Sequence, residues 1–252
     1  MKKKEISILN IPFYNTTQAG FVEELYMAAK NGERRFVVTA NPEIVMHART
    51  DKEFEAILGQ ADYIVPDGIG IIMASEKLGE PLKERVTGYD TMVGLLNKPL
   101  SCYFLGAKPE ISEVVEAKVR EKFPQAVVCG VHHGYFDVLE SEAIAKEILV
   151  AQPDVIFVAL GSPAQEKWIL SQIANFTKGI FIGVGGSFDV LTDSVKRAPK
   201  IWIKLRLEWV YRLLSNPSRW RRFFAIPQFI LVIRKERKRL KRVSKCIFKK
   251  RD

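Results

Sequence analysis

The sequence predicts a doubly wound α/β fold, with a mainly parallel sheet and flanking helices. Short apolar, β-rich runs recur along the first 195 residues, and most are apolar throughout instead of alternating. Such runs are typical of strands that are buried on both faces of a parallel sheet. Polar or glycine-containing turns and helix-length stretches separate the runs. This repeated order of strand, turn and helix predicts the fold class.

Seven apolar runs are the predicted strands, and several segments between them carry helix start signals. The strands are expected at residues 6–11, 36–39, 63–65, 102–105, 126–131, 155–160 and 180–184. Asn41, Pro42 and Glu43 offer a helix cap, a proline at the first helical position and an acid in the first turn. Pro109 and Pro163 are expected to begin helices in the same way.

The charge distribution divides the chain into an acidic body and a basic tail. Residues 196–252 hold 20 Lys or Arg against 3 Asp or Glu, whereas residues 1–195 hold 19 against 26. Such asymmetry indicates an anionic partner for the tail, either a membrane surface or nucleic acid. We therefore expect a catalytic α/β domain at 1–195 and a basic, amphipathic helical appendage at 196–252 that associates with membranes.

The tail contains two helical candidates, at residues 201–214 and 220–233, with Pro217 between them and Pro227 interrupting the second. The apolar run 223–233 is too short to span a bilayer but suits an interfacial segment. We predict no signal peptide and no transmembrane helix. Three cysteines without a Cys-x-x-Cys pair predict neither a disulfide framework nor a zinc site, so a reducing cytoplasm is the expected compartment.

Four turns that follow predicted strands carry residues suited to ligand chemistry. Asp67 follows a strand that Pro66 ends, and the carboxyl ends of parallel strands are where open α/β sheets bind ligands. The competing interpretation is an ordinary Pro-Asp-Gly turn. Thr39 and Asn41 stand beside a helix N-terminus, which is a natural anion site. The other two turns, at 104–108 and 159–163, each place a glycine where the backbone can approach a ligand closely.

Other motifs give weaker signals. The glycine-rich segment 183–188 fits a dinucleotide-binding pattern only in part, so a loop that approaches a phosphate or nucleoside is the better interpretation. Arg85 precedes a helix that is expected to be capped near Thr87, where an arginine can pair with phosphate. The pair His132 and His133 lacks a further ligand at metal-binding spacing. No Asp-x-Asp motif is present to hold a metal on a diphosphate.

Five motifs, in this order, resemble those of the WecG/TagA/CpsF glycosyltransferase family. They are TANPE at 39–43, PDGIG at 66–70, RVTGYD at 85–90, GSPAQEK at 161–167 and EWVYRL at 208–213. The resemblance runs from about residue 6 to residue 224 and implies a compact α/β enzyme. It implies transfer of a sugar, typically N-acetylmannosamine from its UDP donor, to N-acetylglucosamine linked by diphosphate to undecaprenol. It also implies inversion at the anomeric carbon, no metal or cofactor, and a place in cell-surface polymer synthesis such as that of wall teichoic acid.

The resemblance also assigns roles to residues. Asp67 resembles the general base on the acceptor hydroxyl. Thr39 is implied as a further catalytic residue that also contacts the donor. Substrate contacts are implied for Asn41, Gly68, Arg85, Asp90 and Gln165. Nucleoside contacts are implied for Gly106, Tyr135, Gly161, Gly185 and Asp189. The appendage is expected to close over the site and to contribute the catalytic arginines Arg212, Arg219 and Arg222.

Alternatives remain at this stage. N-acetylmannosaminuronic acid or glucose could replace N-acetylmannosamine in the donor, and the oligomeric state is open. A nucleic-acid-binding protein is motivated by the basic tail, but the apolar run beside the charges suits a bilayer interface better than a phosphate track. The expected partners are therefore a UDP-sugar, a lipid-linked acceptor and an anionic membrane, on its cytoplasmic face, and no nucleic acid. A nicotinamide dehydrogenase is the third and weakest hypothesis.

Overall fold

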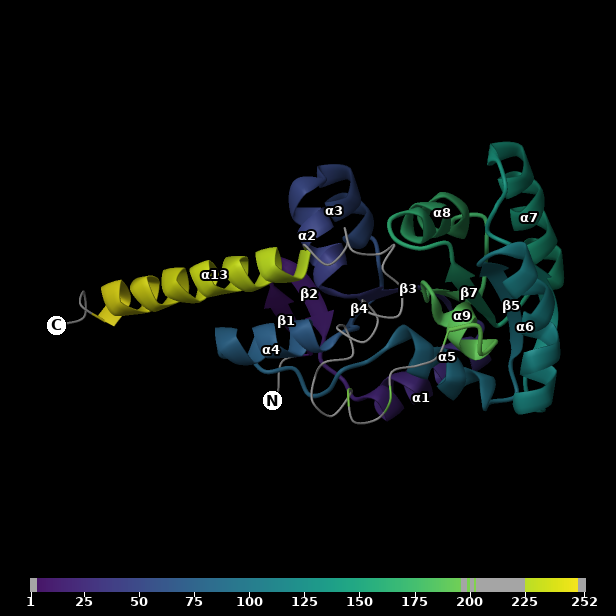
Figure 1. Ribbon diagram of the computed structural model, residues 1–252, viewed down its shortest axis with the longest axis horizontal. Helices are drawn as coiled ribbons and strands as arrows, with labels where there is room; N and C mark the ends of the chain where they lie inside the picture. The colour runs from purple at the N-terminus through teal and green to yellow at the C-terminus, as the bar shows by residue number, and fades with distance from the viewer. Residues whose placement is uncertain (1–3, 196–198, 200–201, 203–224, 249–252) are drawn as a thin grey trace.

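The computed structural model describes residues 4–195, 199, 202 and 225–248, and it contains a six-stranded parallel sheet between layers of helices (Figure 1). The strand order is β4-β3-β8-β7-β5-β6, and every neighbouring pair is parallel. The strands are β3 (Arg34–Ala40), β4 (Tyr63–Pro66), β5 (Ser101–Gly106), β6 (Val127–His132), β7 (Val155–Ala159) and β8 (Gly179–Gly183). The predicted fold class and six of the seven predicted strands are confirmed.

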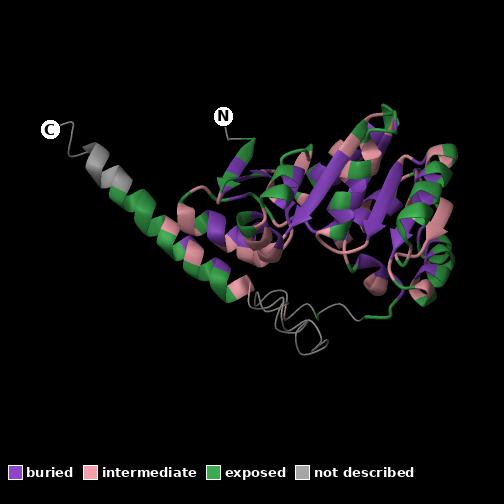
Figure 2. Cartoon of the chain, turned by 90° about the horizontal axis from the view of Figure 1, so that it is seen from above, coloured by how far each residue is buried: buried purple, intermediate pink, exposed green. Residues whose placement is uncertain are grey.

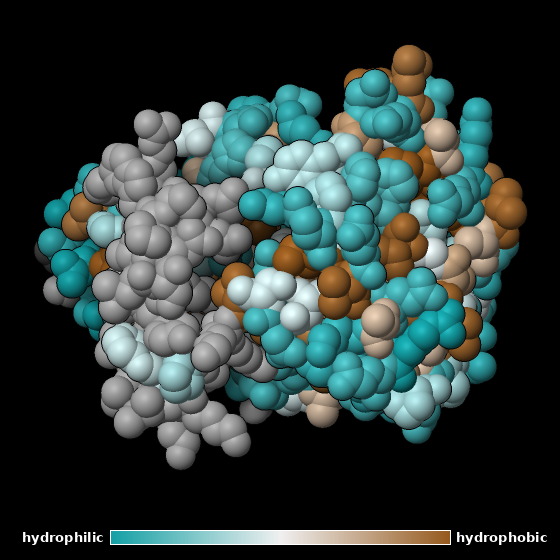
Figure 3. Space-filling view, turned by 45° about the vertical axis from the view of Figure 1, so that its right-hand side comes forward, coloured by the Kyte–Doolittle hydropathy of each residue, from teal (hydrophilic) through white to brown (hydrophobic). Residues whose placement is uncertain are grey.

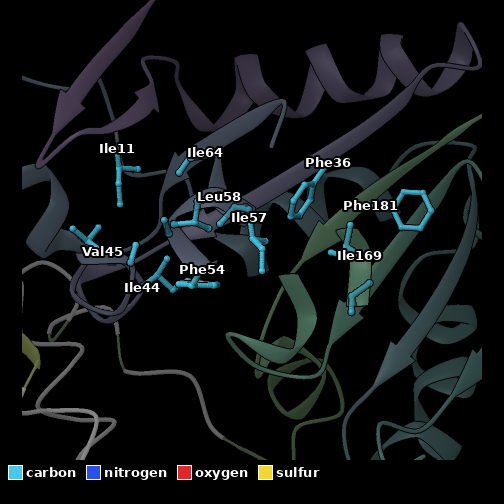
Figure 4. Packing of buried hydrophobic residues seen from close by; sticks show 14 of the residues in the cluster. Ile11, Phe36, Ile44, Val45, Phe54, Ile57, Leu58, Ile64, Ile169 and Phe181 are labelled. Atoms are coloured by element: carbon cyan, nitrogen blue, oxygen red, sulfur yellow. The ribbon is translucent and has the colours of Figure 1, made fainter. Parts of the chain in front are cut away.

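The helices cover both faces of this sheet, and side chains that alternate along each strand pack into two separate cores. The first core joins the sheet to α2 (Pro42–Thr50), α3 (Lys52–Leu58), α4 (Ile69–Leu78), α7 (Val138–Ala151) and α8 (Ala164–Ile173). The second core joins it to α1 (Gln18–Lys30), α5 (Gly88–Leu96), α6 (Pro109–Lys122) and α9 (Ser187–Leu191). In Figure 4, Phe36, Ile64 and Phe181 from the strands face Leu58 and Ile169 from the first of these layers.

The first apolar run is not a strand of the main sheet, so that part of the prediction is wrong. It forms β1 (Glu5–Ile8) and, with the following residues, β2 (Ile11–Tyr14), an antiparallel hairpin. Leu9 and Asn10 form its two-residue turn, with φ values of 51° and 70°. This is the left-handed conformation that tight hairpin turns require. A leucine at the first position gives no sign of a turn, which explains the error.

The C-terminal end of the described chain is one long helix, α13 (Ala225–Phe248), as expected for a helical appendage. Pro227 lies in the first turn of this span and does not interrupt it, because the helix continues for 21 residues beyond that position. Phe229 and Ile233 are each 2% exposed and belong to the first core, where α13 packs against α2 and α4. The helical candidate at 201–214, apart from Trp202, and residues 220–224 of the candidate at 220–233 lie outside the described residues, whereas residues 225–233 of that candidate are helical.

The remainder of α13 extends away from the body and is largely exposed (Figure 2). No helix among the described residues is both long enough and apolar enough to cross a membrane. At the opposite end of the molecule, apolar residues are visible at the right-hand edge of the space-filling view (Figure 3), the side on which Figure 1 places α7. Exposed apolar side chains of α7 include Val138, Leu139 and Val150.

We expect replacement of Gly106 by alanine to destabilise the sheet strongly. Gly106 has a φ of 131°, and an added Cβ would lie 2.5 Å from the carbonyl carbon of Ala159 on the neighbouring strand. Backbone strain and the clash together predict a loss of about 3 kcal/mol or more in the free energy of unfolding, measured with urea. Gly32→Ala is the control, because Gly32 has a φ of 68° with open space around it, and it should lose about 1 kcal/mol. Equal losses in the two variants would contradict this account.

Candidate active site

The six parallel strands all end at one edge of the sheet, here called the carboxyl edge, and the predicted site residues are distributed along it. In spatial order, Asp67 follows β4, Thr39 lies near the end of β3, Gly185 follows β8 and Gly161 follows β7. Gly106 and Tyr135 then continue the row at β5 and β6. Five strand spacings of about 4.8 Å give this row a length of about 24 Å. The arrangement suits an elongated ligand better than a compact one.

Asp67 lies where the chain leaves β4, and backbone hydrogen bonds fix it there. Its N–H donates to the carbonyl of Ala40 on β3 (2.9 Å). Its carboxylate oxygen Oδ2 accepts a hydrogen bond from the N–H of Gly88, the first residue of α5 (3.2 Å). The side chain is half-buried. A carboxylate that is held beside a helix N-terminus in this way is kept in one orientation.

Thr39, near the end of β3, packs against the start of α5, which holds Asp67. Its hydroxyl donates a 2.7 Å hydrogen bond to the carbonyl of Gly183 at the end of β8, and the residue is only 6% exposed. The N-terminus of α5 packs directly against it, because a Cβ added to Gly88 would lie 3.1 Å from the Thr39 hydroxyl. A larger residue than glycine would therefore push α5 away from Asp67.

The turn after β3 and the turn after β4 contact each other. Asn41 caps α2 as predicted, its side-chain oxygen accepting from the N–H of Ile44 (3.0 Å), and Pro42 occupies the first helical position. Gly68 has a φ of 129° and precedes α4. A Cβ on Gly70 would lie 2.7 Å from the Pro42 ring. Two helix N-termini thus meet beside Asp67, and both present positive dipole ends to the carboxyl edge.

Arg85 and Asp90 lie on either side of the predicted cap of α5. Thr87 is confirmed as that cap, because its hydroxyl accepts from the N–H of Asp90 (2.9 Å) and donates to the Asp90 carboxylate (2.8 Å). Asp90 therefore stabilises the helix start. Arg85 is half-buried in the segment that leads to this cap, and the next residue, Val86, donates its N–H to the carbonyl of Pro66 (3.1 Å). This hydrogen bond places the arginine's backbone next to the Asp67 turn.

Gln165 lies beneath the carboxyl edge and is 2% exposed. Its side-chain oxygen accepts from the N–H of Gly185 (3.1 Å), and its amide nitrogen donates to the neighbouring carboxylate of Glu166 (2.8 Å). Gln165 therefore fixes the backbone of the loop that follows β8 at Gly185. Its helix starts later than predicted, because Pro163 is the cap residue of α8, after a cis Ser162–Pro163 peptide bond, and not the first helical residue.

Glu166 is the most unusual ionisable residue near the site, and no local pattern in the sequence distinguishes it. It is fully buried, and neither its Oε2 atom nor the Ser162 hydroxyl has a hydrogen-bond partner within the described part of the chain. Burial raises the pKa of Glu166, and the hydrogen bond from the Gln165 amide opposes this shift. An acid in the first turn of a helix is normally a dipole partner at the surface, which explains why it was overlooked.

The predicted nucleoside contacts lie toward the other end of the row. Gly161 has a φ of 76° and Gly185 a φ of 51°, and neither would meet an atom within 4 Å if it carried a Cβ, so both border open space. Tyr135 is 65% exposed. Asp189 is half-buried in the first turn of α9, and its carbonyl accepts from the N–H of Val195 (2.9 Å). Arg212, Arg219 and Arg222 lie outside the described residues.

His132 and His133 are adjacent at the end of β6, where the His132 ring contacts the His133 carbonyl through Nδ1 (2.8 Å). Within the ranges that the structure describes, no three His, Cys, Asp or Glu side chains gather in a way that could hold a metal ion. His47 lies on α2, with its ring stacked on Phe54 at a centroid distance of 4.6 Å.

The fold and the row of turns are typical of α/β enzymes that bind their ligands along the carboxyl edge of the sheet. Comparison with known proteins makes the class specific. The chain belongs to the glycosyl transferase WecG/TagA/CpsF family, whose model matches residues 6–243. The protein is therefore a glycosyltransferase.

Characterised relatives cover nearly the whole chain. A protein of Bacillus spizizenii (strain W23) is 41% identical over 243 residues, which are 93% of this chain and 92% of the relative. A Bacillus subtilis (strain 168) protein is 40% identical, covering 93% of each chain. A Staphylococcus aureus (strain MRSA252) protein is 37% identical, covering 95% of this chain and 96% of the relative. All three are named N-acetylglucosaminyldiphosphoundecaprenol N-acetyl-beta-D-mannosaminyltransferase.

We expect Glu166→Gln to change the pH dependence of stability. The pKa of Glu166 is raised from its ordinary 4.5 on folding, so its contribution to stability is full below that value and is lost as pH rises through the folded pKa. Glutamine keeps an acceptor for Gln165 without the buried charge. The unfolding free energy of the variant minus that of wild type should therefore rise with pH above about 4.5. The rise is at most about 1.4 kcal/mol for each pH unit until the pH reaches the folded-state pKa of Glu166. Urea titrations from pH 4 to 8 measure it, and a pH-independent difference would refute the interpretation.

Proposed function

We propose that this protein transfers N-acetylmannosamine from UDP-N-acetylmannosamine to N-acetylglucosamine carried on undecaprenyl diphosphate, with inversion and without a metal ion. The product would be a β-1,4-linked disaccharide for a cell-surface polymer such as wall teichoic acid. The names of the relatives support the transferred sugar and the acceptor. The observation that carries the proposal is the Asp67 carboxylate, held beside three helix N-termini at one end of an elongated row of ligand-accessible turns.

The linear order of the site fits a nucleotide sugar. The open glycines Gly161 and Gly185, together with Tyr135, lie on the side of the row away from Asp67 and suit the nucleoside. The donor sugar would then extend toward β3 and β4. Its diphosphate would pass the N-termini of the helices that follow these strands, whose N–H groups and dipoles favour negative charge. The anomeric carbon would then lie near Asp67.

The chemistry is a single displacement. Asp67 removes the proton from the attacking acceptor hydroxyl as that oxygen bonds to the anomeric carbon of the donor sugar. The bond from that carbon to the UDP oxygen breaks on the opposite face, its electron pair leaves with the diphosphate, and the anomeric configuration is inverted. The departing charge is stabilised by helix N-termini and by Arg85, and, from the family resemblance, by Arg212, Arg219 and Arg222. The Gly88 N–H holds Asp67 in place during this step.

We further propose that α13 holds the enzyme on the cytoplasmic face of the membrane, where its lipid-linked acceptor lies. The segment 234–248 contains eight Lys or Arg and one Glu. All basic side chains of this helix up to Arg242 are exposed, as are Ile230, Leu231 and Leu240. Basic residues near an anionic bilayer contribute about 1 kcal/mol each, and apolar neighbours add insertion. The same composition would allow nucleic acid to bind, which the second experiment below tests.

Asp67→Asn should abolish sugar transfer and leave UDP binding intact, because asparagine keeps the size of the side chain but cannot accept the proton. UDP release from UDP-N-acetylmannosamine is measured in EDTA, with and without a short-chain lipid-diphosphate N-acetylglucosamine acceptor. Wild type should show acceptor-dependent release and the variant a loss of at least about a thousandfold. Asp62→Asn is the matched control, since Asp62 precedes the opposite end of the same strand and accepts from the Phe36 N–H (2.7 Å). An active Asp67→Asn enzyme would exclude Asp67 as the base.

If the wild-type enzyme releases no UDP from UDP-N-acetylmannosamine, UDP-glucose and UDP-N-acetylmannosaminuronic acid are tested next as donors.

Membrane binding should depend on the exposed charges of α13. Replacing Arg237, Lys238, Lys241 and Arg242 by glutamine should weaken binding to vesicles with 30% phosphatidylglycerol by at least about a hundredfold, because four contributions of about 1 kcal/mol are removed. Vesicle sedimentation measures the effect. The control removes the same charge from four exposed lysines of the body: Lys30, Lys52, Lys146 and Lys167. Equal losses in both variants would contradict a specific role for α13, and duplex DNA that outcompetes the vesicles would favour a nucleic-acid partner.

A further inference from the structure

The segment between α4 and α5 has no regular structure, yet it carries the groups that surround Asp67. Residues 79–87 connect the two helices, and their last part supplies Arg85 and the cap of α5. The hydrogen bond from Gly88 N–H to the Asp67 carboxylate depends on how this segment is held. A connection of this length loses considerable conformational entropy on ordering, so other contacts must fix it.

A clamp from the start of α1 makes those contacts. Gln18 forms hydrogen bonds with three residues of the connection and of α5. Its backbone N–H donates to the Glu84 carboxylate (3.0 Å). Its side-chain oxygen accepts from the Thr87 N–H (2.9 Å), and its amide nitrogen donates to the Thr91 hydroxyl (3.0 Å). Asn15 adds a fourth bond, accepting from the Lys83 N–H (2.9 Å). These residues are separated by more than 60 positions in sequence.

The side chain of Gln18 is specific for this task. Thr87 and Thr91 are 6% and 0% exposed, so the groups that Gln18 satisfies would otherwise be buried without partners. The amide presents its acceptor oxygen to the Thr87 N–H and its donor nitrogen to the Thr91 hydroxyl from two separate atoms. Because the hydroxyl of Thr87 is also bonded to Asp90, both the backbone and the side chain of this cap residue are fixed. The direction of the next N–H, that of Gly88, follows.

We propose that Gln18 is a positioning residue for the catalytic carboxylate: it holds the Thr87 peptide so that the Gly88 N–H remains on Asp67. The inference rests on the proposed function only in naming Asp67 as the base. Gln18 itself does not touch the reacting atoms. Its loss should let the cap rotate, which releases Asp67 from its fixed orientation and slows the chemical step without weakening donor binding.

The test observes Gly88 directly. Thr-Gly occurs only once in the sequence, at residues 87 and 88, so labelling threonine with carbonyl 13C and glycine with 15N gives a single correlated amide signal from the full-length protein. The Asp67→Asn variant shows how the Gly88 signal changes when its hydrogen-bond acceptor loses its charge. Gln18→Ala should move the Gly88 signal and speed its hydrogen exchange by about tenfold or more. Gln18→Glu keeps the acceptor for Thr87 and should move the signal less than Gln18→Ala.

Transfer kinetics provide the second readout. Gln18→Ala should lower kcat by about tenfold while the KM for the donor changes by less than about twofold, and Gln18→Glu should recover part of the loss. Thr16→Ala is the matched control from the same segment, because among the described residues the Thr16 hydroxyl donates to the adjacent Thr17 carbonyl (3.4 Å) and bonds neither α5 nor the segment before it. It should leave both readouts unchanged.

The outcomes separate the two proposals. An unmoved Gly88 signal in Gln18→Ala overturns the role of Gln18, whatever the kinetics show. If the Gly88 signal moves in Gln18→Ala but the wild-type enzyme transfers no sugar, the clamp is supported and the proposed function is contradicted. If Gln18→Ala does not fold, Thr91→Val, which removes only the second arm of the clamp, decides the question. It should accelerate Gly88 exchange by a smaller factor, and no acceleration would overturn the proposal.

Discussion

The pairing of β3 with β8 is the constraint on which the site depends. It joins the first strand of the main sheet to the last one described, with Phe36 opposite Phe181 and Val38 opposite Gly183. The Thr39 hydroxyl fastens the end of this pair to the Gly183 carbonyl at 2.7 Å, across 144 positions of sequence. Because parallel strands end at a common edge, this pairing brings the turns after β3 and β4 level with those after β8 and β7. Without it, the β3–β4 pair, which Asp67 follows, would not be joined to the strands that Gly161 and Gly185 follow.

The carboxyl edge concentrates positive helix ends, and a carboxylate stands among them. Helices α2, α4 and α5 all begin close to Asp67. The same dipoles that would attract a diphosphate therefore also orient this carboxylate. On the proposed function, a fixed direction is what the base needs where the acceptor hydroxyl loses its proton late in the displacement.

Local features of the site could be predicted from the sequence, whereas contacts between distant segments could not. The caps Asn41 and Thr87 and the turn at Asp67 follow from residue types within a few positions. Burial of Gln165 and Glu166 beneath β8, and the clamp that Gln18 makes, depend on strand order and helix placement, which no local pattern contains. The hairpin at residues 5–14 escapes prediction because Leu9, which is not a turn-forming residue, occupies the first position of its turn. Arg212, Arg219 and Arg222 remain predictions from the family resemblance.

The attachment of α13 gives the proposed membrane binding a direction. Phe229 and Ile233 anchor this helix on α2 and α4, the two helices that begin beside Asp67. The tail carries the basic charge, and the body carries an excess of acid, which an anionic bilayer repels. On the proposed function, the membrane therefore meets the molecule on the side of β4 and not on the side of β6. The lipid-linked acceptor would reach the base end of the row, while the nucleoside end, near Tyr135, stays open to the donor that arrives from solution. One substrate from each side is the arrangement that a transferase between a soluble donor and a membrane-bound acceptor requires.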